Sequence, residues 1–394
     1  MTAAVIGGWV DYEFEPVLDA FAENFDARSE VGAAVCVYVD GRPVVDLWGG
    51  LADATTGREW EPDTVTLVYS STKGVTSVCA NRLIEEGRLD PDATVAQYWP
   101  EFAANGKDAI TVRQVMSHQA GLPYVVGDFT LEEALAWEPI VNAIATQAPI
   151  WEPGTRHGYH MRTFGWIVGE IIRRVEGRTV GAYWRDEIAN GLGLDFWIGL
   201  PEEIEPRVAR LVPPKHDLGE LLKKFGADLL LTEVFASPGG LFGYNEMWNT
   251  RALHACELPS SNGIGDARSL ARMYASCIGE VDGVRTLQEA TVAAATVEQA
   301  CGEDAVLMAK SCFGLGFMLG SSFGAANATS AFGHAGAGGS LAFADPAAQL
   351  GFGYVMNDLR FDAKGDPRSE ELVRAVYRSL GLASLAGTAK EKQS

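Results

Sequence analysis

The chain has 394 residues, of which 47% are hydrophobic and 21% are charged, a composition typical of globular proteins. Its formal net charge of −21 argues against nucleic acids and anionic membrane surfaces as partners, because their phosphates would be repelled. The N-terminus lacks the basic segment of a secretory signal, and no apolar run is long enough to span a bilayer. Its six scattered cysteines fit reduced core residues better than a disulfide framework, so we expect a cytoplasmic protein.

The first part of the chain predicts a helix, two strands and a second helix. Apolar residues at helical spacing between 14 and 26 predict an amphipathic helix. Two β-rich runs, 32–39 and 43–48, flank Asp40-Gly41-Arg42 and predict a hairpin, with Gly49-Gly50 ending the second strand. Apolar residues then repeat at three and four over 75–84, which predicts a central helix that begins near Ser70.

The middle of the chain predicts helices, and the last third returns to strands. The expected helices lie over 112–116, after the capping residues Thr130 and Thr179, over 163–176, over 266–279 and over 370–380. The expected strands lie over 313–319, 340–344 and 350–356, and residues 213–245 are rich in loops. This order suggests an α+β fold, in which residues 1–85 and 265–394 form an antiparallel sheet flanked by helices. Residues 86–264 would form an inserted, mostly helical lobe, with the active site in the cleft between the two parts.

Ser70 and Lys73 stand three residues apart at the start of the central helix. Side chains at this spacing lie on the same side of a helix, so we expect the Lys73 amine within hydrogen-bond reach of the Ser70 hydroxyl. A lysine whose pKa is lowered by burial can act as the base of a serine, and a helix N-terminus can stabilise an acyl oxyanion. Ser70 is therefore the candidate nucleophile, although a serine in this position alone is usually only a helix cap.

Two further stretches are candidates for the same site. Tyr159, in the turn before the helix over 163–176, is either a half-buried ring or a proton shuttle whose pKa a nearby ammonium would lower. The stretch 332–340, Phe-Gly-His-Ala-Gly-Ala-Gly-Gly-Ser, precedes a predicted strand. Its free backbone N–H groups can serve as an oxyanion hole, and a plain glycine-rich turn is equally consistent with the pattern.

In this order, the motifs resemble those of serine hydrolases related to class C β-lactamases and D-alanyl-D-alanine peptidases, and most of all the family VIII carboxylesterases. The resemblance covers nearly the whole chain. Its motifs are Trp48-Gly49-Gly50, Ser70-Ser71-Thr72-Lys73, the stretch 114–122, Pro153-Gly154-Thr155, Tyr159 and Gly333-His334-Ala335-Gly336. It implies an α/β sandwich of an antiparallel sheet with helices, plus a mostly helical lobe, in agreement with the order of predicted elements.

The resemblance also implies a role for each residue of the site. Ser70 would be the acylated nucleophile, Lys73 its base and Tyr159 the second acid/base group. The segment His334-Ala335-Gly336 would take the place of the Lys-Thr-Gly strand motif, and the N–H groups of Ser70 and Ala337 would form the oxyanion hole. Such a site needs neither cofactor nor metal, and its partner is a small ester.

Two departures from the β-lactamase pattern bear on the substrate. Met161 stands where Tyr-x-Asn has its asparagine, and its thioether is a poor hydrogen-bonding group. His334 replaces the lysine that receives an antibiotic carboxylate, and an unperturbed histidine is mostly neutral at pH 7. Both changes favour esters with short, uncharged acyl groups. The alternatives are a β-lactamase, a D-amino peptidase or amidase, an acyltransferase on the same site, or a non-catalytic protein that binds acyl ligands.

Other motifs fit catalysis less well. Gly320-Ser321-Ser322-Phe323-Gly324 matches the Gly-x-Ser-x-Gly elbow, but no apolar helix and no acid before a histidine follows it, so we interpret the match as chance. His157 and His160 lack the spacing of a zinc site, and His118 is better interpreted as a structural histidine. Residues 257–263 form either a loop that faces the substrate or a surface turn. The oligomeric state stays open, with a homodimer among the possibilities.

Overall fold

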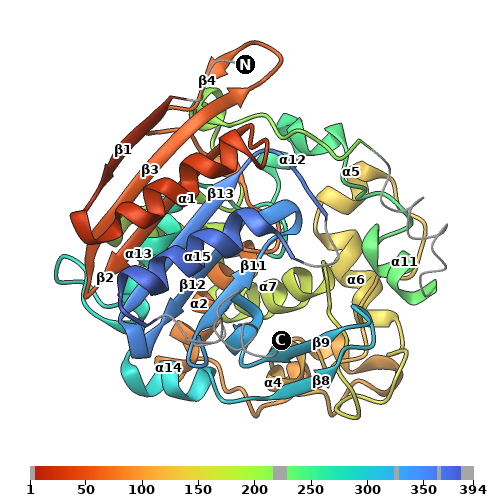
Figure 1. Cartoon of the computed structure of the whole chain (residues 1–394). Helices are drawn as coiled ribbons and strands as arrows, with labels where there is room; N and C mark the ends of the chain where they lie inside the picture. The colour runs from red at the N-terminus through yellow and green to blue at the C-terminus, as the bar shows by residue number, and fades with distance from the viewer. Residues whose placement is uncertain (1–4, 216–228, 324–327, 362–364, 383–394) are drawn as a thin grey trace, which may run out of the picture.

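A large antiparallel sheet lies at the centre of the computed structural model (Figure 1). The structure describes all residues except 1–4, 216–228, 324–327, 362–364 and 383–394. The strands of the sheet follow the order β1-β3-β2-β13-β12-β11-β10-β9-β8, and β4 pairs with β3. Their bounds are β1 Ile6–Val10, β2 Gly32–Val39, β3 Arg42–Asp53, β4 Arg58–Glu59, β8 Ala300–Glu303, β9 Lys310–Phe313, β10 Met318–Leu319, β11 Phe332–Ala335, β12 Leu341–Asp345 and β13 Leu350–Met356. The sheet is therefore built from the two ends of the chain, as predicted.

Helices fill most of the chain between the two groups of strands. A small sheet of β5 (Thr66–Leu67), β7 (Ile264–Gly265) and β6 (Phe196–Trp197) joins this part to the residues before α2. The α-helices are α1 Glu15–Asp26, α2 Thr72–Glu85, α3 Val95–Tyr98, α4 Val112–Met116, α5 Leu131–Leu135, α6 Glu138–Thr146, α7 Thr163–Glu176, α8 Val180–Trp184, α9 Asn190–Leu192, α11 Leu229–Phe235, α12 Arg251–Ala255, α13 Ala267–Ile278, α14 Glu289–Ala295 and α15 Pro367–Ser379. The α+β fold predicted from the sequence is confirmed.

The two faces of the sheet are covered by different helices. Gly351 and Gly353 of β13 let α13 approach closely, because a Cβ atom there would lie 2.5 and 2.4 Å from the carbonyl oxygens of Ala271 and Ala267. Tyr354, the next residue of β13, reaches Glu30 on the opposite face, where α1 packs against α15. The alternation of small and large residues along β13 therefore sets which helix lies on which face.

Several local predictions hold to within a few residues. The side chains of Thr111, Thr130 and Asp266 cap α4, α5 and α13 by accepting hydrogen bonds from backbone N–H groups of the first turn. Part of the loop-rich segment predicted over 213–245 lies outside the described residues, and the described part contains the helix α11. None of the described helices is long and apolar enough to cross a membrane.

The strand predictions are incomplete, since several short strands, β8 and β11 among them, were not predicted. β1 was missed, and β3 does not end at Gly49-Gly50 but continues to Asp53, because pairing with β1 and β2 carries it through the two glycines. The strand expected over 313–319 is two strands, β9 and β10. The chain turns between them at Gly316, which has a φ of 85°, a conformation that glycine adopts without strain.

The prediction of six reduced cysteines is also wrong. Cys301 of β8 and Cys312 of β9 stand directly opposite each other and form a disulfide, whereas Cys36, Cys79, Cys256 and Cys277 are free. A cross-strand pair depends on strand register, which the scattered spacing does not reveal. The cysteine argument for a cytoplasmic location is therefore weaker, and the compartment stays a prediction.

Candidate active site

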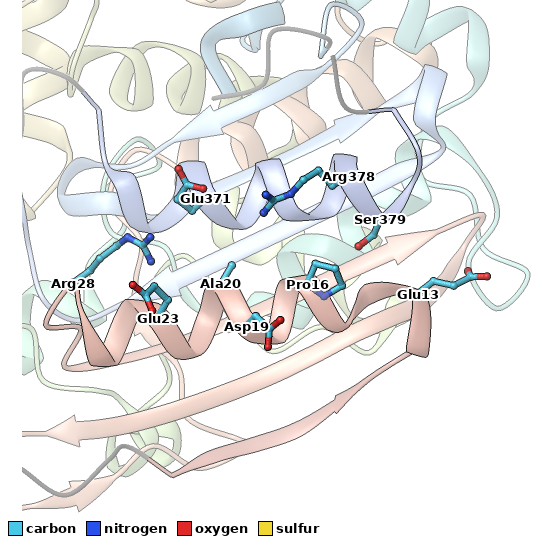
Figure 2. A pocket seen from close by; sticks show the side chains of 9 residues that line it. All are labelled: Glu13, Pro16, Asp19, Ala20, Glu23, Arg28, Glu371, Arg378 and Ser379. Carbon is cyan, nitrogen blue, oxygen red and sulfur yellow. The ribbon is translucent and has the colours of Figure 1, made fainter. Parts of the chain in front are cut away.

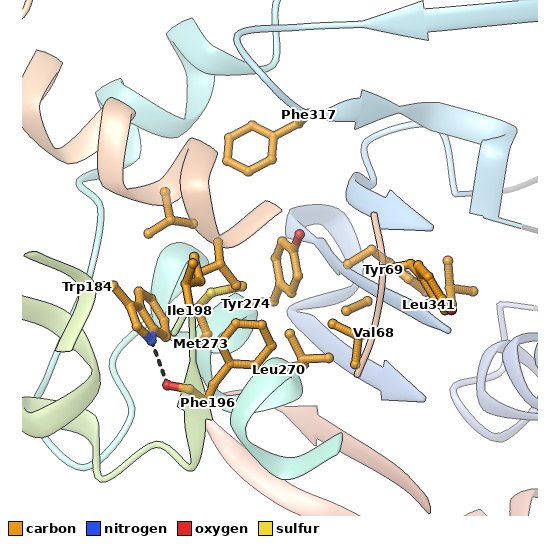
Figure 3. Close-up of a cluster of buried hydrophobic side chains, with 14 of the residues drawn as sticks. Val68, Tyr69, Trp184, Phe196, Ile198, Leu270, Met273, Tyr274, Phe317 and Leu341 are labelled. Atoms are coloured by element: carbon orange, nitrogen blue, oxygen red, sulfur yellow. Dashed lines mark hydrogen bonds between the residues drawn. The ribbon is translucent and has the colours of Figure 1, made fainter. Parts of the chain in front are cut away.

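Ser70 lies in a sharp turn directly before α2. The preceding residue, Tyr69, has a φ of 45°, a left-handed conformation that costs free energy for a residue with a side chain. Val68 and Tyr69 are anchored in the core beside Leu270 and Leu341, which maintains the turn (Figure 3). The N-cap position of α2 belongs to the next residue, Ser71. Ser70 therefore does not serve as the helix cap, and its side chain lines a pocket.

Lys73 is fully buried behind Ser70. Its Nζ lies 3.2 Å from Ser70 Oγ, 2.6 Å from the carbonyl oxygen of Met161 and 3.1 Å from that of Ser260. Burial, with the charge of Arg162 as a second cause, lowers the pKa of Lys73 well below its usual value. The expected contact between the lysine and the serine is present, and the amine stands in an environment that favours its neutral form.

Tyr159 lies on the other side of the lysine. Lys73 Nζ is 4.8 Å from the centre of the Tyr159 ring, and the Tyr159 hydroxyl is 3.5 Å from His334 Nε2. The expected lowering of the tyrosine pKa is wrong. Burial raises the pKa of Tyr159, although a hydrogen bond with Ser70 acts in the opposite direction. The physical reason is that the amine beside the phenol is itself buried and does not supply the full positive charge that the prediction assumed.

The glycine-rich stretch 332–340 comprises β11 and the turn after it, and it lies along the same pocket. His334 Nδ1 lies 2.6 Å from the carbonyl oxygen of Ala335, so Nδ1 carries the hydrogen and Nε2 is free to accept one. Burial, with the Lys73 charge as a smaller cause, lowers the pKa of His334 to about 3. Gly338 has a φ of 85°, and its carbonyl oxygen accepts a hydrogen bond of 2.8 Å from Arg368 Nη2. The turn after β11 is therefore held in place by the buried side chain of Arg368.

One cavity of about 630 Å³ brings most of the predicted residues together. Ser70, Tyr159, Met161, His334, Gly336 and Ala337 all line it. Lys73 does not line it, because it is covered by its neighbours. The remaining lining is mostly apolar and includes Leu231, Phe235, Tyr244, Leu307, Phe313 and Met318. The arrangement suits a small substrate that is largely uncharged.

The backbone and the ring of Tyr159 are positioned by residues that the sequence analysis did not identify. Asp304 Oδ1 accepts a hydrogen bond of 3.0 Å from the Tyr159 N–H, and its Oδ2 accepts one of 2.8 Å from Ser311 Oγ. Phe313 stacks on the Tyr159 ring at 6.1 Å between centroids and 12° between planes. No short motif marks these residues, because they come from the β8–β9 hairpin far along the chain.

Arg162 was missed as well, and the segment 257–263 has a role that differs from both of its interpretations. The side chain of Arg162 is buried directly after Met161, and its charge acts on Lys73. Ser260 and Asn262 are 1% and 0% exposed, so the segment is neither a surface turn nor a loop that faces the substrate. It lies behind the site, where the Ser260 carbonyl holds Lys73. The burial of Arg162 and Ser260 was not visible in the sequence.

The other histidines have structural partners. His160 Nε2 accepts a hydrogen bond of 3.0 Å from the Leu122 N–H, and His157 Nε2 lies 2.9 Å from Ser311 Oγ. His118 Nδ1 accepts a hydrogen bond of 3.1 Å from the His160 N–H, and burial lowers the pKa of His118 well below its usual value. Ser322 lies in a short 3-10 helix after β10 rather than on a strand-to-helix elbow.

Among the described residues, one group has the spacing of a metal site. The ligand atoms of Glu298, Cys301 and Cys312 lie within 4.8 Å of one another. The two cysteines are joined in a disulfide, however, so they have no thiolates to offer a metal. A second pocket, of about 780 Å³, lies between α1 and α15 and is lined largely by charged side chains of both signs (Figure 2). The predicted site residues do not line this second pocket.

The chain is similar to several known proteins in sequence and in fold. The β-lactamase family profile matches residues 18–375. The esterase/β-lactamase LipL of Mycobacterium tuberculosis is 36% identical over 368 residues, which cover 89% of this chain and 83% of that protein. The crystal structure of a family VIII carboxylesterase has a TM-score of 0.86 and 37% identity, covering 95% of this chain and 100% of that chain. A penicillin-binding protein homologue from Caulobacter crescentus has a TM-score of 0.84 and 38% identity, again over 95% of this chain and 100% of that chain.

Proposed function

This chain belongs to the β-lactamase family, and we propose that it hydrolyses carboxylic esters with short acyl chains through a Ser70 acyl-enzyme. The names of two similar proteins, an esterase/β-lactamase and a family VIII carboxylesterase, support an esterase. The observation that carries the proposal is the Lys73 amine, which is buried and lies 3.2 Å from Ser70 Oγ. The pocket is lined from both parts of the chain, which supports an active site in a cleft between the sheet and the helical lobe.

Lys73 is the base that takes the first proton. A neutral amine has two N–H bonds and one lone pair. The carbonyl oxygens of Met161 and Ser260, at 2.6 and 3.1 Å, accept the two hydrogen bonds, which leaves the lone pair for the Ser70 hydroxyl. The Ser70 proton passes to Nζ while Oγ forms a bond to the acyl carbon.

Tyr159 is the acid/base group on the alcohol side. Because its raised pKa keeps the phenol protonated, it can donate a proton to the departing alkoxide and recover one by way of Lys73. The N–H groups of Ser70 and Ala337 are our candidates for the oxyanion hole, since both residues line the pocket and the Gly338 carbonyl beside them is anchored. Water then attacks the acyl-enzyme, which releases the acid and restores the Ser70 hydroxyl.

Met161 and His334 favour esters over β-lactams. The histidine is neutral at any working pH, because its pKa is about 3, so it does not bind a carboxylate as a lysine would. Arg360 also lines the pocket, but its guanidinium donates to Asp358 and to the backbone carbonyls of Arg28 and Ser29. The same nucleophile could serve a β-lactamase, an amidase or D-amino peptidase, or an acyltransferase. The name of one similar protein also includes a β-lactamase, so the lining by Met161 and His334 is the observation that favours the ester.

Hydrolysis of p-nitrophenyl esters from acetate to octanoate tests the proposal, with a chromogenic cephalosporin measured alongside. We expect rapid turnover of the short esters, slow or no turnover of the cephalosporin, and a fall in kcat of about 10³-fold or more in Ser70→Ala. Ser322→Ala is the matched control, because it removes the serine of the rejected elbow, and it should retain turnover. Activity that survives Ser70→Ala and disappears in Ser322→Ala would overturn the assignment. Turnover of the cephalosporin alone would overturn the inference from Met161 and His334, and binding of esters without any turnover would favour a binding protein.

A further inference from the structure

Arg162 is a buried cation, and no carboxylate among the described residues forms an ion pair with it. It stands at the N-terminus of α7 and is 3% exposed. Its Nη1 donates to the carbonyl oxygen of Phe235 at 2.5 Å and its Nη2 to that of Phe242 at 2.6 Å. Its Nε has no hydrogen-bond partner. Across the part of the chain that the structure describes, no ion pair to Arg162 is found, which is unusual because a buried charge is costly without one.

The guanidinium and the Lys73 amine flank the same residue. Lys73 Nζ donates to the Met161 carbonyl oxygen at 2.6 Å, while Arg162 Nη1 is 3.9 Å from the Met161 sulfur. A second link runs through Ser260. Its hydroxyl donates to the Arg162 carbonyl oxygen at 3.0 Å, and its own carbonyl oxygen is 3.1 Å from Lys73 Nζ. The elements that hold the lysine in position therefore also hold the arginine beside it.

Two positive charges that flank one residue in a buried site repel each other, because little water screens them. An arginine does not lose its proton in proteins, whereas a lysine does so readily when buried. The proton is therefore absent from Lys73 rather than from Arg162. The mechanism requires this distribution, since only the free amine of Lys73 can take the proton of Ser70.

The other titratable groups around Lys73 do not offset the lowering of its proton affinity by Arg162. Tyr159 stands beside the amine with its phenol protonated, because burial raises its pKa. His334, His160 and His118 carry no charge at neutral pH, since burial lowers the pKa of all three. The carboxylate of Asp304 acts on Tyr159 and His160, and it is not among the groups that act on Lys73. Burial is the larger cause of the lowered pKa of Lys73, and among the described residues Arg162 is the one charged group that adds to it.

We propose that Arg162 is an electrostatic positioning residue for the reaction: together with burial, its buried guanidinium keeps Lys73 as the free amine that accepts the Ser70 proton. The inference rests on the proposed function, because it assumes that Lys73 is the base. The same charge lies where it stabilises negative charge on Tyr159 when that residue gives up its proton. Arg162 does not touch the substrate, and it acts only through these two side chains.

A purely structural role is the competing explanation. The carbonyl of Phe235 ends α11, and Phe235 also lines the pocket, so the hydrogen bonds from Arg162 hold part of the pocket wall. Loss of such a support would change substrate binding equally at every pH. Loss of the charge would instead raise the pKa of Lys73 and make activity more sensitive to acid. The pH profile therefore separates the two roles.

The experiment compares kcat/KM for p-nitrophenyl acetate from pH 5 to 10 in the wild type, Arg162→Met, Arg162→Gln and Ser260→Ala. Both arginine variants remove the charge, and glutamine can still donate to one of the two carbonyls, so it serves if the methionine variant does not fold. Ser260→Ala is the matched control, because it removes the hydrogen bond to the Arg162 backbone and leaves the guanidinium. Rates are normalised to the amount of p-nitrophenol released in the pre-steady-state burst, which counts only folded sites.

We expect the acidic limb of the profile to move to higher pH by about 1 unit or more in the two arginine variants and to stay in place in Ser260→Ala. At a pH on that limb, the loss is then about tenfold, and activity recovers toward the wild-type value at alkaline pH. A uniform loss with an unmoved limb would overturn the proposal and support the structural role. If Lys73→Met retains full activity in the same assay, the proposed function fails instead, because the base would be another group.

Discussion

Arg162 and Arg368 are both buried, but their charges are balanced in different ways. Arg368 is fully buried, with Nη1 at 2.9 Å from Glu30 Oε1 and Nη2 at 2.6 Å from Asp366 Oδ2. Its remaining N–H groups reach the carbonyls of Asp358 and Gly338. Arg162 donates only to carbonyl oxygens and to the Met161 sulfur. One guanidinium is neutralised by two carboxylates, and the other keeps its positive charge.

The difference shows how similar side chains serve two purposes. The network of Arg368 joins α15 to Glu30 and to the turn at Gly338, so its main effect is on stability and on the shape of the oxyanion turn. The charge of Arg162 acts on Lys73, and no carboxylate of the described residues forms an ion pair with the guanidinium. A buried charge that is paired holds a structure together, and one that is left unpaired changes the proton affinity of its neighbours.

The strongest test of this comparison is Arg368→Met. The change leaves Glu30 and Asp366 without their partner, so the free energy of unfolding should fall by about 3–5 kcal/mol. The protein that remains folded should keep the acidic limb of its pH–rate profile, because Arg368 is not among the groups that act on Lys73. Urea unfolding and the burst-normalised ester assay measure the two effects. A moved limb with unchanged stability would show that the two arginines do not differ as proposed.

A smaller loss of stability is expected when the pH is lowered, because two buried histidines of the site are held neutral. Burial holds the pKa of His334 at about 3 and that of His160 at about 4, against 6.5 for the unperturbed group. The unfolded chain therefore binds more protons than the folded chain below pH 6.5. The stabilisation is complete above pH 6.5 and is lost as the pH falls toward the folded-state values, by roughly 1.4 kcal/mol per pH unit for each histidine.

Urea unfolding at pH 7, 6, 5 and 4.5 measures this loss. Carboxylates also take up protons in part of this range, so the comparison with His160→Gln isolates the contribution of one histidine. The variant is expected to lose less stability than the wild type between pH 6.5 and 4.5, whatever its stability at pH 7. Equal losses in the two proteins would mean that His160 is not held neutral by burial.

The smallest change in stability is expected for an ion pair at the surface, because water can solvate either charge when its partner is removed. Arg42 and Asp11 form an ion pair of 2.7 Å whose side chains are 62% and 38% exposed. In Arg42→Ala we expect a melting temperature that is indistinguishable from that of the wild type, because exposed pairs contribute little. A clear drop in the melting temperature, as measured by calorimetry, would mean that pairing stabilises this protein even without burial.

The predictions from the sequence were best where few neighbouring residues decide the structure. The helix predicted over 163–176 has those bounds, and the strand over 350–356 has them too. The approach of Lys73 to Ser70 also follows from spacing along one helical turn. The strand missed at Ile6–Val10 has two glycines and an exposed tryptophan, so its pattern is weak, and pairing with β3 makes it a strand.

The sequence by itself determined the order of strands and helices, the helix caps and the presence of a serine, a lysine and a tyrosine that could form one site. These features depend on side-chain chemistry and on residues a few positions apart. Only the tertiary structure decided that Tyr159 has a raised pKa, that Cys301 meets Cys312, and that Arg162 stands unpaired beside Lys73. Those properties depend on burial, register and Coulomb interactions between segments distant in the chain, because the folded arrangement alone sets how much water and which charges surround a group.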